Sequence, residues 1–115
     1  MKTSMGRAAI FLIPAGKMNM ACGQITISEA VREFLTNTFG AFQESTEHIS
    51  GYWRGCFDGT FVQFKVAFLG KKRIVLLDDF LEGLAHTMGE LSIYEETGED
   101  AWEISPDPNK TYPAL

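Results

Sequence analysis

Alternating apolar and polar residues identify the clearest strand of the chain, over residues 60–68. One set of alternate positions is entirely apolar and the other set is mixed, which is the period of a strand with one face against a core. We expect the apolar set to lie against helices and the mixed set to lie on an open face. The apolar set is Val62, Phe64, Val66 and Phe68, and the mixed set is Phe61, Gln63, Lys65 and Ala67.

Two other segments carry apolar residues at helical spacing. Thr26 and Glu29 form a capping box before the first, which predicts a helix over 27–38 that ends at Gly40. The second helix is predicted up to Gly89, and the residues 73–76 at its start suit either a helix or a short strand. Its apolar stripe is Leu77, Phe80, Leu81, Leu84 and Met88.

The remaining pattern completes an alternating order of strands and helices. Strands are predicted at 8–13, 44–54, 91–95 and 101–104, with a loop over 14–25 and a hairpin turn at 56–59 around an Asp-Gly pair. The order β-α-β-β-α-β with an extra strand predicts a ferredoxin-like α+β fold, with an antiparallel sheet and helices on one face. We expect one domain over 1–104 and an extended tail over 105–115, either free or lying on a neighbouring subunit.

Composition narrows the classes of function. The chain has 115 residues and a net charge of −5, from 15 acidic and 10 basic residues, so we expect no nucleic-acid partner. The longest apolar run is far shorter than the roughly 20 residues that span a bilayer, which predicts no membrane partner and no exported leader. Cys22 and Cys56 have no CxxC spacing, which favours a reduced, cytoplasmic location.

No cluster of residue types indicates a metal or a catalytic triad. His48 and His86 lack acidic or cysteine partners at ligand spacing, and neither cysteine has an obvious base, so we expect no metal site and no thiol nucleophile. The adjacent acids are interpreted as charges at a helix N-terminus and at solvated turns. They are Asp78 with Asp79, Glu95 with Glu96, and Glu99 with Asp100.

Hydrophobicity predicts which face of the strand over 44–54 lies against the core. Ile49, Gly51 and Trp53 are placed with the core, which leaves the other set on the open face, namely His48, Ser50, Tyr52 and Arg54. Tyr52 is then predicted to lie close to Gln63, eleven residues later, on one face of two neighbouring strands. The plainer interpretation is a solvated polar face without chemistry.

At 45–55 the sequence STEHISGYWRG resembles the bacteriophage enzymes that degrade S-adenosylmethionine, known as SAM hydrolases and better described as SAM lyases. The shared pattern is a Ser-Thr-rich approach to a Gly-Tyr-aromatic-Arg strand end. A turn, an alternating strand, a helix and a final strand pair follow in the same order, so the resemblance covers residues 8–104. An uncharacterised group of ferredoxin-like proteins carries a similar Gly-aromatic-Trp-Arg-Gly stretch.

The resemblance implies that S-adenosylmethionine is the substrate, with no cofactor, and that methylthioadenosine and homoserine lactone are the products. In the family a tyrosine and a later glutamate line the site; Tyr52 matches the first, and Gln63 replaces the second. Gln63 keeps the shape and loses the charge, as in an engineered or a natural inactive relative, so slow turnover is expected. The further substrate-binding candidates are Ser50, Phe42 and, in the 14–25 loop, Met18.

The family also implies a homotrimer with sites between subunits and, for a phage-encoded protein, action in the host cytoplasm. Two other functions stay open. One is a non-enzymatic ferredoxin-like oligomer that binds a host protein through its acidic surface. The other is a different small enzyme on the same fold, such as a monooxygenase. Thermal stabilisation by S-adenosylmethionine would favour the lyase, because a ligand of the folded state raises its melting temperature.

Overall fold

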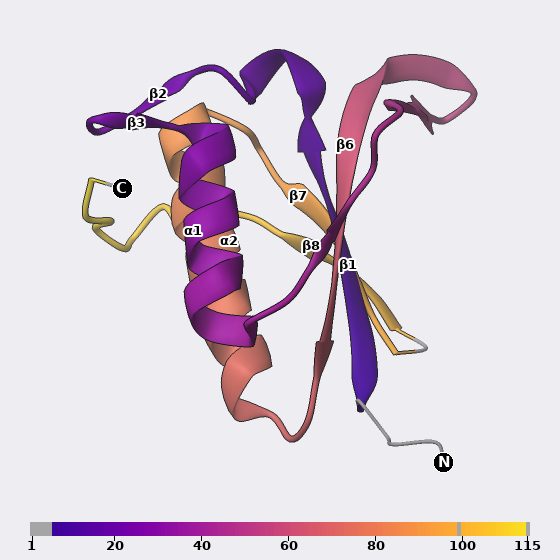
Figure 1. Ribbon diagram of the computed structural model, residues 1–115. Helices are drawn as coiled ribbons and strands as arrows, with labels where there is room; N and C mark the ends of the chain where they lie inside the picture. Colours follow the sequence, from indigo (N-terminus) through magenta and orange to yellow (C-terminus); the bar gives the residue numbers. More distant parts are fainter. Residues whose placement is uncertain (1–5, 99, 115) are drawn as a thin grey trace.

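The computed structural model describes residues 6–98 and 100–114. Its main elements follow the predicted order of strands and helices (Figure 1). They are β1 (Arg7–Pro14), α1 (Ile27–Phe39), β4 (Gln43–Glu44), β5 (Ile49–Trp53), β6 (Cys56–Phe68), α2 (Lys72–Met88), β7 (Ile93–Thr97) and β8 (Asp100–Ile104).

Among the described residues, these strands form a six-stranded antiparallel sheet in the order β4-β6-β1-β7-β8, with β5 paired to β6. The two helices lie side by side against one face of this sheet (Figure 1). β1 occupies the centre because β6 and β7, which follow it far along the chain, pair with its two edges. The ferredoxin-like α+β fold predicted from the sequence is therefore confirmed.

The core lies between the helices and the covered face of the sheet. In β6 all four residues of the predicted apolar set are at most 5% exposed, so that face prediction is correct. The Phe64 ring stacks on Phe11 of β1 with centroids 5.2 Å apart, and Phe34 of α1 stacks on Phe80 of α2 at 4.1 Å. Burying such rings between layers supplies much of the stability of a domain this small.

Local signals set the helix ends as expected. The backbone N–H of Glu29 donates to Thr26 Oγ1 at 3.2 Å, which is the predicted capping bond, and Gly40 ends α1. α2 begins at Lys72, so the ambiguous segment 73–76 is helical, and Gly89 ends α2 in the left-handed conformation.

The loop over 14–25 has more structure than its sequence predicts. It contains a short 3-10 helix, η1 (Ala15–Lys17), and a two-stranded hairpin of β2 (Ala21–Cys22) and β3 (Ile25–Thr26). Cys22 of this hairpin is buried, whereas Cys56 at the start of β6 is exposed. Both thiols are free.

The predicted strand over 44–54 is broken, and its hairpin turn lies elsewhere. β4 is tied to α1 because Arg32 donates two hydrogen bonds of 2.8 Å to the Glu44 carboxylate, and β5 starts only at Ile49. The turn is at Arg54 and Gly55, whose φ angles of 50° and 79° suit a tight hairpin turn. Asp58 and Gly59 lie inside β6, so the turn predicted there is wrong.

The C-terminal segment 105–114 forms no helix or strand. It lies against α2 of its own chain, where the Tyr112 hydroxyl hydrogen-bonds the Glu82 carboxylate and its ring lies 5.0 Å from that of His86. Lys110 adds an ion pair to Glu82 at 3.5 Å. The tail is therefore held by its own helix rather than being free.

No helix in the described part of the chain is both long and apolar enough to cross a bilayer.

Candidate active site on the open face of the sheet

The face of the sheet away from the helices, here called the open face, carries the candidate chemistry. Strand register assigns its members, because directly paired residues of antiparallel strands share a face. Gln63 pairs with Leu12, and Lys65 pairs with Ile10, which in turn pairs with Glu96 of β7. On β1, β6 and β7 the open face thus includes Ala8, Ile10, Leu12, Pro14, Phe61, Gln63, Lys65, Ala67, Tyr94 and Glu96.

Gln63 occupies the middle of this face. Its backbone is fixed on both sides by Ser45, whose Oγ accepts from the Gln63 N–H at 2.9 Å and whose N–H donates to the Gln63 carbonyl at 2.8 Å. Its side chain is half-buried beside Leu12. The open-face position predicted for Gln63 is therefore confirmed.

Tyr52 does not lie beside Gln63 in the same chain. Ile49 pairs with Phe61 and Gly51 pairs with Gly59, so Ile49 and Gly51 share the open face, and Ser50 and Tyr52 project to the other side. Tyr52 pairs with Phe57, and the six residues from Phe57 to Gln63 span about 20 Å of strand. The predicted faces of this strand are reversed, and the predicted juxtaposition within one chain is wrong.

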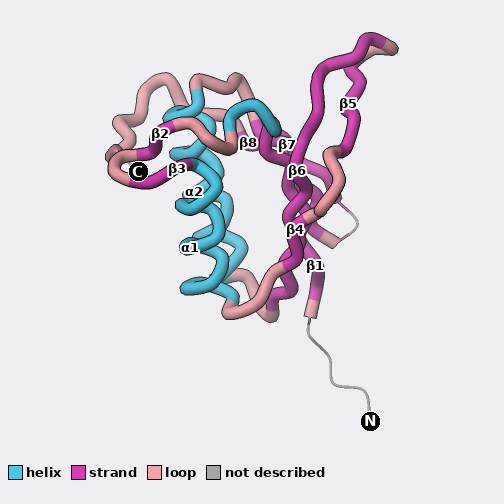
Figure 2. The backbone as a smooth tube through the Cα atoms, turned by 45° about the horizontal axis from the view of Figure 1, so that its top comes forward, coloured by secondary structure: helices cyan, strands magenta, loops and turns pink. Residues whose placement is uncertain are grey.

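The reason for the error is the position of the hairpin. Figure 2 shows the tip of β5 and β6 projecting away from the helices, so hydrophobicity there does not distinguish a buried face from an open one. Tyr52, Trp53 and Phe57 are all more than half exposed. A bulge at Asp58, which no β5 residue faces, shifts the register at the tip by one residue.

The other candidates are spread over three places. Ser50 pairs with Thr60 on the side away from the open face. Met18 is 8% exposed and belongs to the hydrophobic core, so its side chain does not reach the open face. Phe42 is half-buried against Phe64, with ring centroids 6.3 Å apart.

A cavity of about 650 Å³ opens on the open face at the hairpin end of the sheet. Aromatic rings of Trp53, Phe61 and Tyr94 line it together with the acids Asp58 and Glu90. Phe61 and Tyr94 immediately flank the Gln63–Leu12 pair in the strand register. Among the described residues, the lining combines rings and carboxylates and has no lysine or arginine, which favours a cationic ligand that has an aromatic part.

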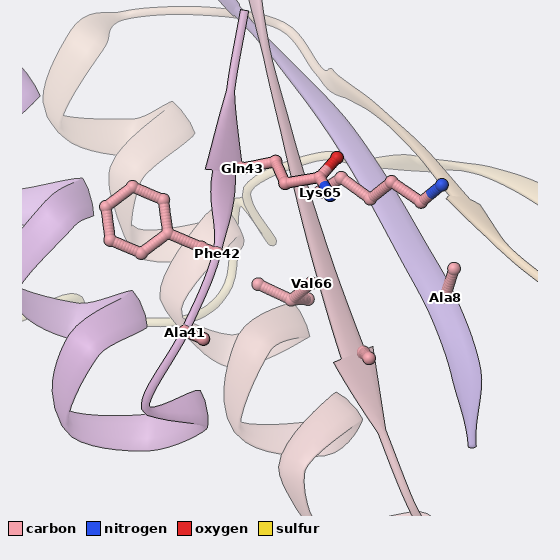
Figure 3. A pocket seen from close by; sticks show the side chains of 7 residues that line it. Ala8, Ala41, Phe42, Gln43, Lys65 and Val66 are labelled. Carbon is pink, nitrogen blue, oxygen red and sulfur yellow. The ribbon is translucent and has the colours of Figure 1, made fainter. Parts of the chain in front are cut away.

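A smaller cavity of about 330 Å³ lies beyond Gln63 at the β4 edge. Figure 3 shows the side chains of Gln43 and Lys65 lying side by side across the sheet, while Phe42 points to the opposite side of its segment. Gln43 and Lys65 are paired in register, and alanines line much of the rest. Gln63 therefore lies between two hollows of the same face.

Two neighbouring acids of β7 have different surroundings, and neither sits in a solvated turn as the sequence suggested. Glu96 is on the open face, where its Oε1 accepts from the Tyr94 hydroxyl at 2.6 Å. This hydrogen bond to a carboxylate, with some burial, raises the pKa of Tyr94. The pair was missed because Tyr-x-Glu matches no catalytic motif, although its spacing of two is what places both residues on one face.

Glu95 points the other way, into the core, and is only 1% exposed. Both of its carboxyl oxygens and Oδ1 of Asp78 are buried, and no donor from the described side chains reaches them. Burial first, and then the nearby Asp78 carboxyl, raise the pKa of Glu95 to about 8. A proton on Glu95 thus supplies a hydrogen-bond donor between the Glu95 and Asp78 carboxyl groups. Asp78 lies in the second turn of α2, so the prediction that it is a charge at the helix N-terminus is wrong.

Metal-binding side chains do not gather in the residues described. In the part of the chain whose side chains the structure describes, no three His, Cys, Asp or Glu residues are placed to hold an ion together. His48 is exposed, and His86 lies against Tyr112.

The chain was compared with family models, with curated proteins and with solved structures, and only solved structures match it. No family model and no curated protein matches the sequence. A solved phage SAM lyase in its apo state is similar over 96% of this chain and 98% of its own, with a TM-score of 0.58 and 16% identity. A phage SAM lyase in complex with S-methyl-5'-thioadenosine is similar over 94% and 95%, with a TM-score of 0.51 and 15% identity. At these identities the likeness is one of fold.

Proposed function

We propose that this chain binds S-adenosylmethionine on the open face of its sheet and belongs to the SAM lyase type of enzyme. The observation that carries the proposal is the 650 Å³ cavity beside Gln63, lined by three aromatic rings and by acids. A sulfonium nucleoside matches this lining, because its cation suits rings and carboxylates and its adenine suits stacking. The fold likeness to phage SAM lyases over nearly the whole chain supports the same substrate.

The proposed reaction needs positioning rather than a strong acid or base. The substrate carboxylate attacks its own γ-carbon, the C–S bond breaks, and the electron pair neutralises the sulfonium. The products are methylthioadenosine and homoserine lactone, so atoms and charge balance without a co-reactant. Holding the methionine chain in its curled conformer supplies the rate advantage of an intramolecular reaction.

The residue at position 63 determines the rate of turnover that we expect. An amide at position 63 keeps a hydrogen bond to the substrate ammonium and lacks the charge that a glutamate would add to the local field. We therefore expect slow turnover in the unaltered chain, whether Gln63 is natural or engineered.

The exposed hairpin tip supports a homotrimer with its sites between subunits. Tyr52 lies about 20 Å of strand from Gln63 in its own chain, so it can serve the same site only if it comes from a neighbouring subunit. Tyr52, Trp53 and Phe57 form an exposed aromatic tip of the kind that assembly covers. In this arrangement Ser50 accompanies Tyr52, Phe42 lines the smaller cavity, and Met18 has only a packing role.

The test is incubation with S-adenosylmethionine and chromatography of the products, for the unaltered chain and for Gln63→Glu. We expect methylthioadenosine and homoserine lactone from Gln63→Glu at a rate at least about tenfold above the unaltered chain, which is the effect of one charged hydrogen bond. Gln24→Glu adds the same charge in the exposed 14–25 loop and is the matched control. Sedimentation of the same samples gives the number of subunits.

No product from any variant, together with no thermal shift on adding S-adenosylmethionine, would overturn the proposal. A rate for the unaltered chain equal to that of Gln63→Glu would leave the lyase in place and remove the role given to position 63.

A further inference from the structure

Glu96 lies on the open face, and a hydrogen bond from the Tyr94 side chain holds its carboxylate in position. The Tyr94 hydroxyl donates to its Oε1 at 2.6 Å, and Glu96 is half-buried between its neighbours on β7. A carboxylate that is already ordered loses little conformational freedom when it takes up a ligand. Its second oxygen remains to accept from a cationic donor.

The two acids that line the larger cavity, Asp58 and Glu90, are less suited to hold a cation. The Glu90 carboxylate pairs with Lys17 Nζ at 3.5 Å, so part of its charge is already balanced. Asp58 is exposed in the bulge at the hairpin tip, where water screens it. Among the described residues Glu96 makes no ion pair, and its hydrogen bond comes from a neutral hydroxyl.

Strand register places Glu96 within reach of a ligand that also contacts Gln63. Gln63 pairs with Leu12, and Glu96 pairs with Ile10, two residues along the same strand. Two strand spacings across and two residues along give about 12 Å between the Cα atoms of Gln63 and Glu96. Tyr94 lines the larger cavity and lies two residues from Glu96 along β7, at the level of the Gln63–Leu12 pair.

On this geometry, and resting on the proposed function, we propose that Glu96, oriented by Tyr94, binds the ammonium group of the substrate's amino acid part. It provides on β7 the negative charge that position 63 lacks on β6. Glu96 is thus a specificity residue for ligands that carry an α-ammonium group, and Tyr94 is its positioning residue.

The experiment compares two ligands by calorimetry. S-adenosylmethionine has the ammonium group, whereas methylthioadenosine lacks the amino acid part. We expect Glu96→Gln to weaken binding of S-adenosylmethionine about 10- to 100-fold, as for loss of a charged hydrogen bond, and to leave methylthioadenosine binding within about twofold. Tyr94→Phe should weaken S-adenosylmethionine binding about threefold to tenfold, again without effect on methylthioadenosine.

A rescue variant and two controls make the result specific. Adding Gln63→Glu to Glu96→Gln restores a charge to the same face and should recover most of the lost affinity. Glu33→Gln removes the same charge from the exposed side of α1 and should change neither ligand. Asp58→Asn removes the competing acid of the cavity, and thermal unfolding of each variant verifies that it is folded.

Each result has a distinct meaning. Unchanged S-adenosylmethionine binding in Glu96→Gln, equal loss for both ligands, or a loss confined to Asp58→Asn would each overturn the role of Glu96 and leave the proposed function standing. If the unaltered chain and Gln63→Glu bind neither ligand, the proposed function fails, and this inference fails with it.

Discussion

On the covered face of β1 and β6, Phe11 and Phe64 are fully buried. Leu12 follows Phe11 and Gln63 precedes Phe64, yet both are only half-buried because they lie on the open face. The two faces share one backbone and differ in what lies over them. Helices cover the first, and cavities lie on the second. Because of this difference, we expect substitutions on the covered face to change the free energy of unfolding and those on the open face to change ligand binding.

Glu95 is the exception on the covered face, and it should give the largest effect, a dependence of stability on pH. Its folded-state pKa is raised to about 8 from an ordinary value of 4.5, so the folded chain holds the proton more tightly. The free energy of unfolding that this bound proton adds is therefore fully present below about pH 4.5 and is lost as pH rises through 8. At about 1.4 kcal/mol per pH unit, the loss is roughly 4 to 5 kcal/mol.

Urea unfolding at several pH values between 5 and 9 measures this loss. Glu95→Gln keeps the shape and donates a hydrogen bond to Asp78 at every pH, so its unfolding free energy should be much flatter over that range. An unaltered chain that is equally stable at pH 5 and pH 9 would contradict the buried, protonated state of Glu95.

Phe64→Ala tests the covered face where it is apolar. The ring is fully buried and stacks on Phe11, so its loss should lower the free energy of unfolding by about 3 to 5 kcal/mol. Lys65→Ala, one residue along on the open face and exposed, should change it by less than about 0.5 kcal/mol. Chemical unfolding of both variants measures the contrast, and equal losses would break the distinction between the faces.

Gly51→Ala should have the smallest effect of the three and sharpens the same contrast within the hairpin. A Cβ at Gly51 would lie 2.4 Å from Cε2 of Phe61, so the ring must turn aside. We expect a loss of about 1 kcal/mol, together with a change in ligand affinity, because Phe61 lines the larger cavity. Gly16→Ala, where a Cβ would meet nothing within 4 Å, is the matched control and should change neither unfolding nor affinity. An unaltered affinity in Gly51→Ala would contradict the position given to Phe61.

Much of the fold follows from short-range patterns in the sequence. The alternation in 60–68 predicts its buried residues correctly, and the capping pair Thr26 and Glu29 predicts the start of α1. The candidate site is only partly predictable in this way. Gln63 lies on the open face as expected, but the residues gathered around it, such as Tyr94 and Glu96, come from a strand some thirty residues later.

The sequence by itself determined where the helices lie, which residues of β6 are buried and the ferredoxin-like order, because each depends on periodicity within one segment. Tertiary structure alone decided the register of β5 on β6, the bulge at Asp58 and the burial of Glu95 beside Asp78. Register depends on pairing between segments, and a reversed face assignment moves every side chain of a strand to the other side. That is why the sequence placed Tyr52 beside Gln63 and the structure does not.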